Sequence, residues 1–93
     1  QAVGKAGLAV ILVDISTPMF EKTYDFYLEE NISTAQIIDE VIGIIAEKEG
    51  YTFSRNDDMA NLNLFDEDRR LLLNSEESLS ANGIKNGSRL ILV

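Results

Sequence analysis

Gly83-Ile84-Lys85-Asn86-Gly87-Ser88-Arg89-Leu90-Ile91-Leu92-Val93 is the stretch that decides the fold. Its first half contains two glycines and an asparagine, which are residues that favour tight turns. Its second half, Leu90 to Val93, is a run of aliphatic residues and is typical of a buried strand. The sequence therefore predicts a turn that leads directly into a final strand, and we expect that strand to close a sheet.

Two further strands are predicted near the start of the chain. Leu8 to Ile15 is apolar apart from Asp14, and Lys22 to Leu28 alternates with a period of two. Turn residues at 16–21 connect them, so we expect an antiparallel hairpin with Asp14 and Asp25 on its solvent side. The side chains expected to face inward are Ile11, Val13, Ile15, Tyr24, Phe26 and Leu28.

A helix is predicted after the hairpin. Ser33 and Gln36 have the spacing of a capping box, and Gly50 fits the position just past the last turn. Aliphatic residues recur between them at spacings of three and four, which is the pattern of one buried helix face. These residues are Ile37, Ile38, Val41, Ile42 and Ile45. We expect this helix to be the main contributor to the core.

The rest of the chain predicts shorter elements. Tyr51–Asn61 is a polar loop, Leu62–Phe65 a short strand, 66–68 a charged turn, Arg70–Leu73 another short strand, and Leu79–Ile84 a helical turn or loop. The order is β-β-α-β-β-β, in which helix and sheet are segregated as in α+β folds. The first and last strands are both nearly continuous in apolar residues, so we expect them to pair in parallel at the centre of the sheet.

Composition indicates one domain and excludes several kinds of chemistry. The chain has 93 residues with 45% hydrophobic side chains, enough for a single core, and we expect domain 8–93 after a disordered leader or expression remnant at 1–7. It has no cysteine, which excludes thiolate metal sites, disulfides and a cysteine nucleophile. It has no histidine, the usual general base at neutral pH. We therefore expect no enzyme activity and no cofactor or metal.

The charge and hydropathy of the chain bear on its partners. A formal net charge of −8 disfavours nucleic acid and anionic membrane, which proteins bind mainly through lysine and arginine. A cationic protein surface is the better complement. No segment approaches the roughly 20 apolar residues that a membrane span needs, so we expect no membrane insertion and a cytoplasmic location.

The predicted elements and their motifs resemble a known family. The element order, the capped helix and the closing pattern Leu79-x4-Ile84-x2-Gly87-x2-Leu90-x-Leu92 resemble ubiquitin. A closer resemblance is to the YukD-like (EsaB-like) proteins that accompany type VII, or Esx-type, secretion systems, and it covers nearly all of residues 10–93. Its motifs are Val13-Asp14-Ile15, Tyr24-Asp25-Phe26-Tyr27-Leu28 and Gly83-Ile84-Lys85-Asn86-Gly87-Ser88-Arg89-Leu90.

This resemblance implies a ubiquitin-like β-grasp fold, a mixed five-stranded sheet with one helix packed across it. It further implies an accessory or regulatory role in a type VII secretion system of a Gram-positive bacterium. The expected partners are proteins of the secretion apparatus, met in the cytoplasm or at the periphery of the membrane complex, and the expected state is a monomer or weak homo-oligomer. Since the sequence has no terminal Gly-Gly, we do not expect conjugation or sulfur transfer.

Two surfaces are candidates for binding. Similarity to ubiquitin implies a patch on the open sheet face, and the residues expected there are Met19, Phe20, Asn63, Ile91 and Val93. The alternative is that the strand residues are half covered and the turn residues fold back over the hairpin. The second surface is acidic and resembles the acidic motif of PB1 domains, which pair through ionic contacts. Its residues are Asp57, Asp58, Asp66, Glu67, Asp68, Glu76 and Glu77, with Asp66, Glu67 and Asp68 at its centre.

The acidic residues also have plainer interpretations. A run of charges is usually solvated surface, which is the alternative for the PB1-like motif. Asp14 and Asp25 could suggest acid–base chemistry because they face each other across the predicted hairpin. Without a nucleophile or metal ligands beside them, we interpret both as outward strand residues that discourage edge pairing.

Overall fold

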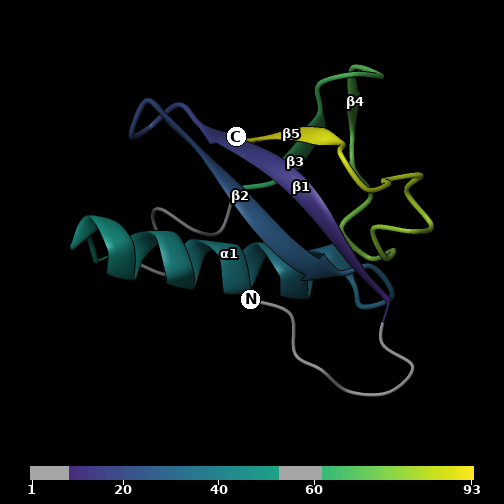
Figure 1. Cartoon of the computed structure of the whole chain (residues 1–93), viewed down its shortest axis with the longest axis horizontal. Helices are drawn as coiled ribbons and strands as arrows, with labels where there is room; N and C mark the ends of the chain where they lie inside the picture. The colour runs from purple at the N-terminus through teal and green to yellow at the C-terminus, as the bar shows by residue number, and fades with distance from the viewer. Residues whose placement is uncertain (1–8, 53–61) are drawn as a thin grey trace.

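The computed structural model describes residues 9–52 and 62–93. Within them lie five strands and one helix (Figure 1): β1 (Val10–Thr17), β2 (Lys22–Glu29), α1 (Thr34–Glu49), β3 (Leu64–Asp66), β4 (Leu71–Leu72) and β5 (Arg89–Leu92). The predicted order β-β-α-β-β-β is confirmed. The predicted leader at 1–7 and most of the predicted loop, residues 53–61, lie outside the described residues.

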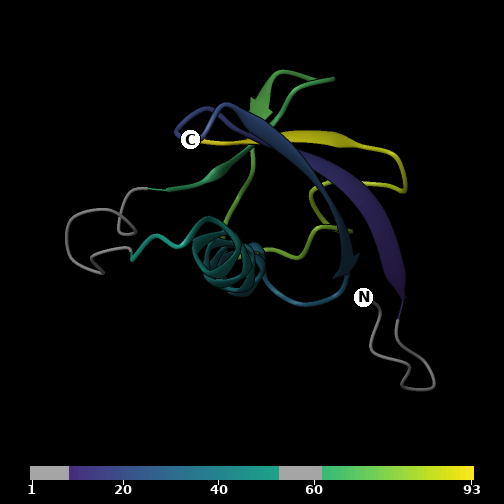
Figure 2. The same ribbon diagram turned by 60° about the vertical axis from the view of Figure 1, so that its left-hand side comes forward.

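The strands form one mixed sheet in the order β2-β1-β5-β3-β4. β1 and β5 pair in parallel at its centre, as predicted, and the other pairs are antiparallel. Figure 2 shows α1 end-on against one face of this sheet, while no helix of the described residues lies over the other face. The molecule thus has two layers, and one face of the sheet is left open.

The core lies between α1 and the sheet. β1 alternates between half-buried and buried residues, so Ile11, Val13 and Ile15 all point toward the helix, as predicted. Phe26 and Leu28 on β2 are buried beside them, whereas Tyr24 is only partly buried. The helix contributes the aliphatic residues that its spacing predicted: Ile37, Ile38, Val41, Ile42 and Ile45.

Both ends of α1 have the predicted caps. The hydroxyl of Ser33 accepts a hydrogen bond from the Gln36 amide at 3.2 Å, and Gly50 ends the helix in the left-handed region at φ 65°. The Gln36 side chain reaches the Ser33 hydroxyl instead of its backbone amide. The two amides that precede Gln36 in the first turn, those of Thr34 and Ala35, donate to the carbonyls of Glu77 and Ser75 at 2.8 and 2.9 Å. The segment before β5 therefore caps the helix from outside its own sequence.

Several predicted boundaries were wrong by one or two residues. β1 continues to Thr17, whose hydroxyl donates to the Lys22 carbonyl at 2.8 Å and so ties the hairpin together at its turn. β3 begins at Leu64 and includes Asp66, which was predicted to lie in a charged turn. Asp66 is only 2% exposed, because its carboxylate has partners inside the fold that offset the cost of burial.

Candidate protein-binding surface

The strand register places one apolar row across the open face of the sheet. Ser16 on β1 pairs with Ile91 on β5, Ile91 pairs with Phe65 on β3, and Phe65 pairs with Leu72 on β4. Paired residues lie on the same face, and the neighbours of these residues in β1, β3 and β5 are the buried ones. Leu72 is 59% exposed, while Ile91 and Phe65 are half buried.

Val93 extends this apolar row just beyond the end of β5. It is 49% exposed, and its backbone exchanges two hydrogen bonds with Asn63, at 2.7 and 2.9 Å. Because it follows Ile91 by two residues along the same ladder, it lies on the same face. We call Phe65, Leu72, Ile91 and Val93 the apolar row. Neighbouring exposed apolar side chains of this kind are a feature of protein-binding sites.

The structure places some of the sequence-based candidates on this face. Ile91 and Val93 lie there, as expected. Asn63 lies beside Val93, but it is half buried and its side-chain oxygen accepts a hydrogen bond from the Leu64 amide at 2.8 Å, so it is engaged with its own strand. Sequence reasoning missed Phe65 and Leu72. The period of two in the third strand could have identified Phe65, which follows Asn63 by two residues.

The two candidates in the β1–β2 turn behave differently from each other. Met19 is 54% exposed. Phe20 instead packs against the core, and its ring meets that of Tyr51 edge-on, with centroids 5.7 Å apart. Tyr51 follows the end of α1, so Phe20 lies toward the helix layer. For Phe20 the structure agrees with the alternative in which the turn folds back over the hairpin.

The centre of the acidic candidate surface is largely used within the domain. The Asp66 carboxylate accepts hydrogen bonds from the amides of Asp68 and Arg69, at 3.0 and 3.2 Å, and pairs with Arg69 Nε at 2.6 Å. Asp68 receives a hydrogen bond from Arg89 Nε at 3.1 Å, and the Arg89 guanidinium holds the pKa of Asp68 below its usual range. Glu67 is exposed. Asp66, a candidate for the acidic surface, is therefore buried and paired within the domain.

The acidic surface also has four outlying members. Asp57 and Asp58 lie outside the described residues, and Glu76 and Glu77 are exposed in the segment before β5. The Glu77 backbone carbonyl accepts a hydrogen bond from the first turn of α1. The backbone of Glu77, and not its carboxylate, thus contacts the helix.

Asp14 and Asp25 lie directly opposite each other on the open face, as predicted. Ala9 and Glu30 form a hydrogen-bonded pair, so the alternation of the antiparallel ladder makes Asp14–Asp25 a non-hydrogen-bonded pair, in which side chains come closer. A shared hydrogen bond with Asp25 raises the pKa of Asp14; partial burial and the charge of Asp25 raise it further, while Arg89 lowers it.

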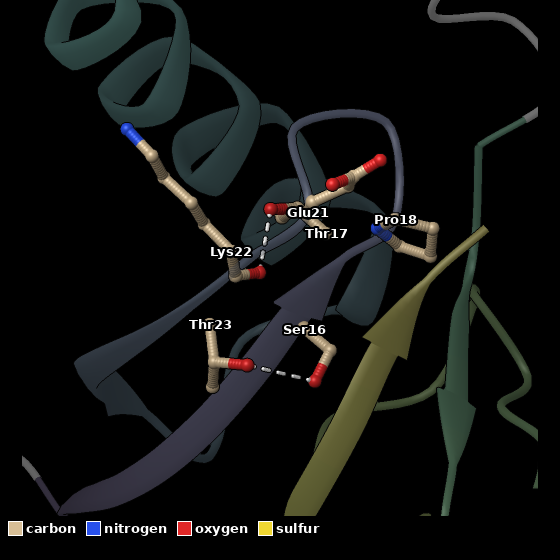
Figure 3. Close-up of a pocket in the computed structure, with 6 residues that line it drawn as sticks. All are labelled: Ser16, Thr17, Pro18, Glu21, Lys22 and Thr23. Atoms are coloured by element: carbon tan, nitrogen blue, oxygen red, sulfur yellow. Dashed lines mark hydrogen bonds between the residues drawn. The ribbon is translucent and has the colours of Figure 1, made fainter.

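A shallow hollow lies at the β1–β2 turn, and Figure 3 shows the residues that line it. Two hydrogen bonds connect residues that line it. The Ser16 and Thr23 hydroxyls lie 3.2 Å apart, and Thr17 donates to the Lys22 carbonyl. The Lys22 side chain extends to α1, where its ammonium is 3.0 Å from Glu49. The hollow therefore gives no indication of a ligand.

Two further tests apply to the part of the chain that the structure describes. Within residues 9–52 and 62–93, no three side chains of the metal-binding types are grouped so that they could hold a metal ion. Within the same residues, no helix has the length and apolar character needed to cross a membrane.

Comparison with solved structures identifies the fold. The chain is similar to the ubiquitin-like domain of the Mycobacterium tuberculosis type VII secretion protein EccD1, with TM-score 0.70, 22% identity, and coverage of 92% of this chain and 99% of that one. It is similar to the EccD5 ubiquitin-like domain from Mycobacterium xenopi, with TM-score 0.71, 17% identity, and coverage of 91% and 93%. It also matches a chain of the MycP5-free ESX-5 inner membrane complex, with TM-score 0.69, 15% identity, and coverage of 90% of this chain and 20% of that one.

These similarities define the class of the protein. It is a ubiquitin-like β-grasp domain, a fold that is typically non-catalytic. Its structural neighbours include ubiquitin-like domains of type VII secretion proteins, but at these identities the likeness establishes the fold alone. No family model matches the sequence, and no curated protein matches it either.

Proposed function

We propose that this domain is a non-catalytic protein-interaction module, a YukD-like accessory or regulatory component of a type VII secretion system in a Gram-positive bacterium. The observation that carries the proposal is the apolar row on the open sheet face. The row exposes Leu72 and Val93, beside Ile91 and Phe65, in a domain of formal net charge −8. Exposed apolar side chains on a strongly charged domain favour a protein partner.

The structural neighbours support the secretion context. Two of them are ubiquitin-like domains of EccD proteins, and a third is part of an ESX-5 inner membrane complex. By this analogy the partners are components of the secretion apparatus, and the domain works in the cytoplasm at the periphery of the membrane complex. Binding is a docking event in which the apolar row supplies contact area and the acidic surroundings steer a cationic partner.

The sheet face supports this proposal better than an ionic scaffold of the PB1 type. Such a scaffold needs acidic side chains that are available to a neighbouring molecule. Here Asp66 is 2% exposed and paired with Arg69, while Asp68 is paired with Arg89. Salt provides a further distinction, because screening weakens an ionic scaffold steeply and apolar docking little.

Gene deletion with complementation tests the proposal. Secretion of an Esx-type substrate should fall when the gene is removed, return with the wild-type chain, and fail to return with Ile91→Asp, which places a charge in the apolar row. Ile44→Asp is the matched control, because Ile44 is 48% exposed on the helix, away from the sheet face. Circular dichroism should show both variants folded. Normal secretion in the deletion strain would refute the secretion role.

A further inference from the structure

The open face has a second apolar pair, separated from the apolar row by carboxylates. Leu12 on β1 pairs with Tyr27 on β2, which is 55% exposed. The next pair on this face is Asp14–Asp25, and Ser16, which adjoins Ile91 of the apolar row, comes after it. Successive pairs on one face lie about 7 Å apart, the rise of two residues. The face thus alternates apolar, acidic and apolar over a distance that one short peptide segment can span.

Within the described residues, neither Asp14 nor Asp25 forms an ion pair. Arg89 is the register neighbour of Asp14 and its charge acts on that carboxylate, but its guanidinium is paired with Asp68. The other ion pairs in the part of the chain that the structure describes join Lys22 to Glu49 and Arg69 to Asp66. Like charges directly opposite each other on a sheet are unfavourable, and a cation placed over them would remove that repulsion.

We propose that the open sheet face binds a segment of a partner protein in which an arginine or lysine lies between apolar side chains. The cation lies over Asp14 and Asp25, and the flanking side chains contact Leu12 and Tyr27 on one side and Ile91 with its neighbours on the other. This inference rests on the proposed function, since it specifies the partner of the same surface. A second copy of the chain is a poorer occupant, because two domains of net charge −8 repel each other.

Cation binding at this pair is linked to the release of protons from it. Since the pKa of Asp14 is raised, chiefly by its hydrogen bond with Asp25, part of the population holds a proton there at acidic pH. The charged groups around Asp14 are Asp25 from β2 and Arg89 from β5, with Asp68 and Glu67 beside Arg89. A bound cation favours the ionised pair, so binding should release protons and should strengthen as the pH rises through the raised pKa.

A selection from random peptides tests the inference without requiring that the partner be identified. The full chain is used to select binders from a random short-peptide phage library, and the enriched peptides are synthesised and measured by calorimetry. We expect enriched sequences with arginine or lysine flanked by apolar residues, and a roughly tenfold loss of affinity for Asp14→Asn/Asp25→Asn. The matched control is Glu76→Gln/Glu77→Gln, which removes the same charge from the segment before β5 and should change affinity by no more than about twofold.

The possible outcomes separate this inference from the proposed function. Three results would each overturn the inference. The binders could have no basic residue, they could keep full affinity for the double asparagine variant, or the selection could yield no binder. Peptides that lose affinity for Ile91→Asp but not for Asp14→Asn/Asp25→Asn would leave the sheet face as a docking surface and refute its cationic requirement. The secretion assay is a separate measurement, so a failure of the proposed function can be distinguished from a failure of this inference.

Discussion

Asp66 links three segments of the second half of the chain through one carboxylate. It holds the β3–β4 turn by accepting from the amides of Asp68 and Arg69, and it orients the Arg69 guanidinium. Arg69 in turn donates to the carbonyl of Asn82. It passes so close to Gly83, which has φ 79°, that an added Cβ would lie 2.6 Å from Arg69 Nη1. A single buried side chain therefore connects β3 to the segment before β5.

Replacing Asp66 should therefore destabilise the fold. Asp66→Ala leaves two amides and a guanidinium without their acceptor, and we expect a loss of about 2 kcal/mol of unfolding free energy, as for hydrogen bonds to charged groups. Urea denaturation measures it. Glu67→Ala removes a neighbouring exposed carboxylate and should change stability by no more than about 0.5 kcal/mol. Equal losses for the two variants would show that Asp66 has no structural role beyond its charge.

At the scale of elements, local signals were predictable from sequence and long-range partners were not. Ser33 and Gly50 were correctly identified as the ends of α1, because a cap depends on neighbours within a few residues. Asn82 was not singled out, although its amide donates to the Ser78 and Asn74 carbonyls at 2.9 and 3.0 Å and to the Thr34 hydroxyl at 3.3 Å. An asparagine in a polar segment looks like any turn residue until the helix is placed against it.

The junction of α1 and β2 gives a pH-dependent prediction. The Tyr24 hydroxyl donates to Glu49, whose carboxylate also pairs with Lys22 at 3.0 Å. The hydrogen bond to Glu49, then burial and the charge of Glu49, raise the pKa of Tyr24 to about 12, and the Tyr24 hydrogen bond is the main cause that lowers the pKa of Glu49. For a group whose folded pKa is raised, the stabilisation is full below the ordinary value and is lost as pH rises through the raised one.

The wild-type chain should therefore lose the Tyr24 contribution between about pH 10 and about pH 12. Tyr24→Phe should be less stable than wild type at neutral pH, and the difference should shrink across that alkaline range. Thermal melts over the range measure both slopes. Tyr27→Phe, at an exposed position on the open face, is the control and should follow the wild-type slope. Parallel curves for wild type and Tyr24→Phe would show that the hydrogen bond does not contribute.

At the scale of the whole molecule, the topology could be predicted from patterns of hydrophobicity. Predicting which residues lie together on the open face also required the register of the strands. Continuous apolar residues in the first and last strands correctly predicted the parallel centre of the sheet. The pairing of Ile91 with Phe65 and of Phe65 with Leu72 depends on where three strands start, and the predicted starts were wrong by one or two residues. A shift of one residue moves every side chain to the other face, so the site was only partly predictable.

The same register predicts the position at which shortening a side chain destabilises the fold most. Leu90 is fully buried on β5, between its partners Ile15 on β1 and Asp66 on β3, on the side of the sheet that faces the helix. Leu90→Ala should cost about 3 kcal/mol, within the usual range for a buried leucine. Because a domain of this size has roughly 5 to 14 kcal/mol of stability, that loss is a large fraction of the total.

Leu71→Ala is the matched control for this prediction. It makes the same chemical change on β4, at the edge of the sheet, where the Leu71 side chain is 53% exposed. Much less apolar surface is removed from water there, so the loss should stay below about 1 kcal/mol. Urea denaturation of both variants, with equal m-values, measures the difference. Losses of similar size would mean that β5 is not the centre of the core, and the parallel pairing of β1 with β5 would then have to be wrong.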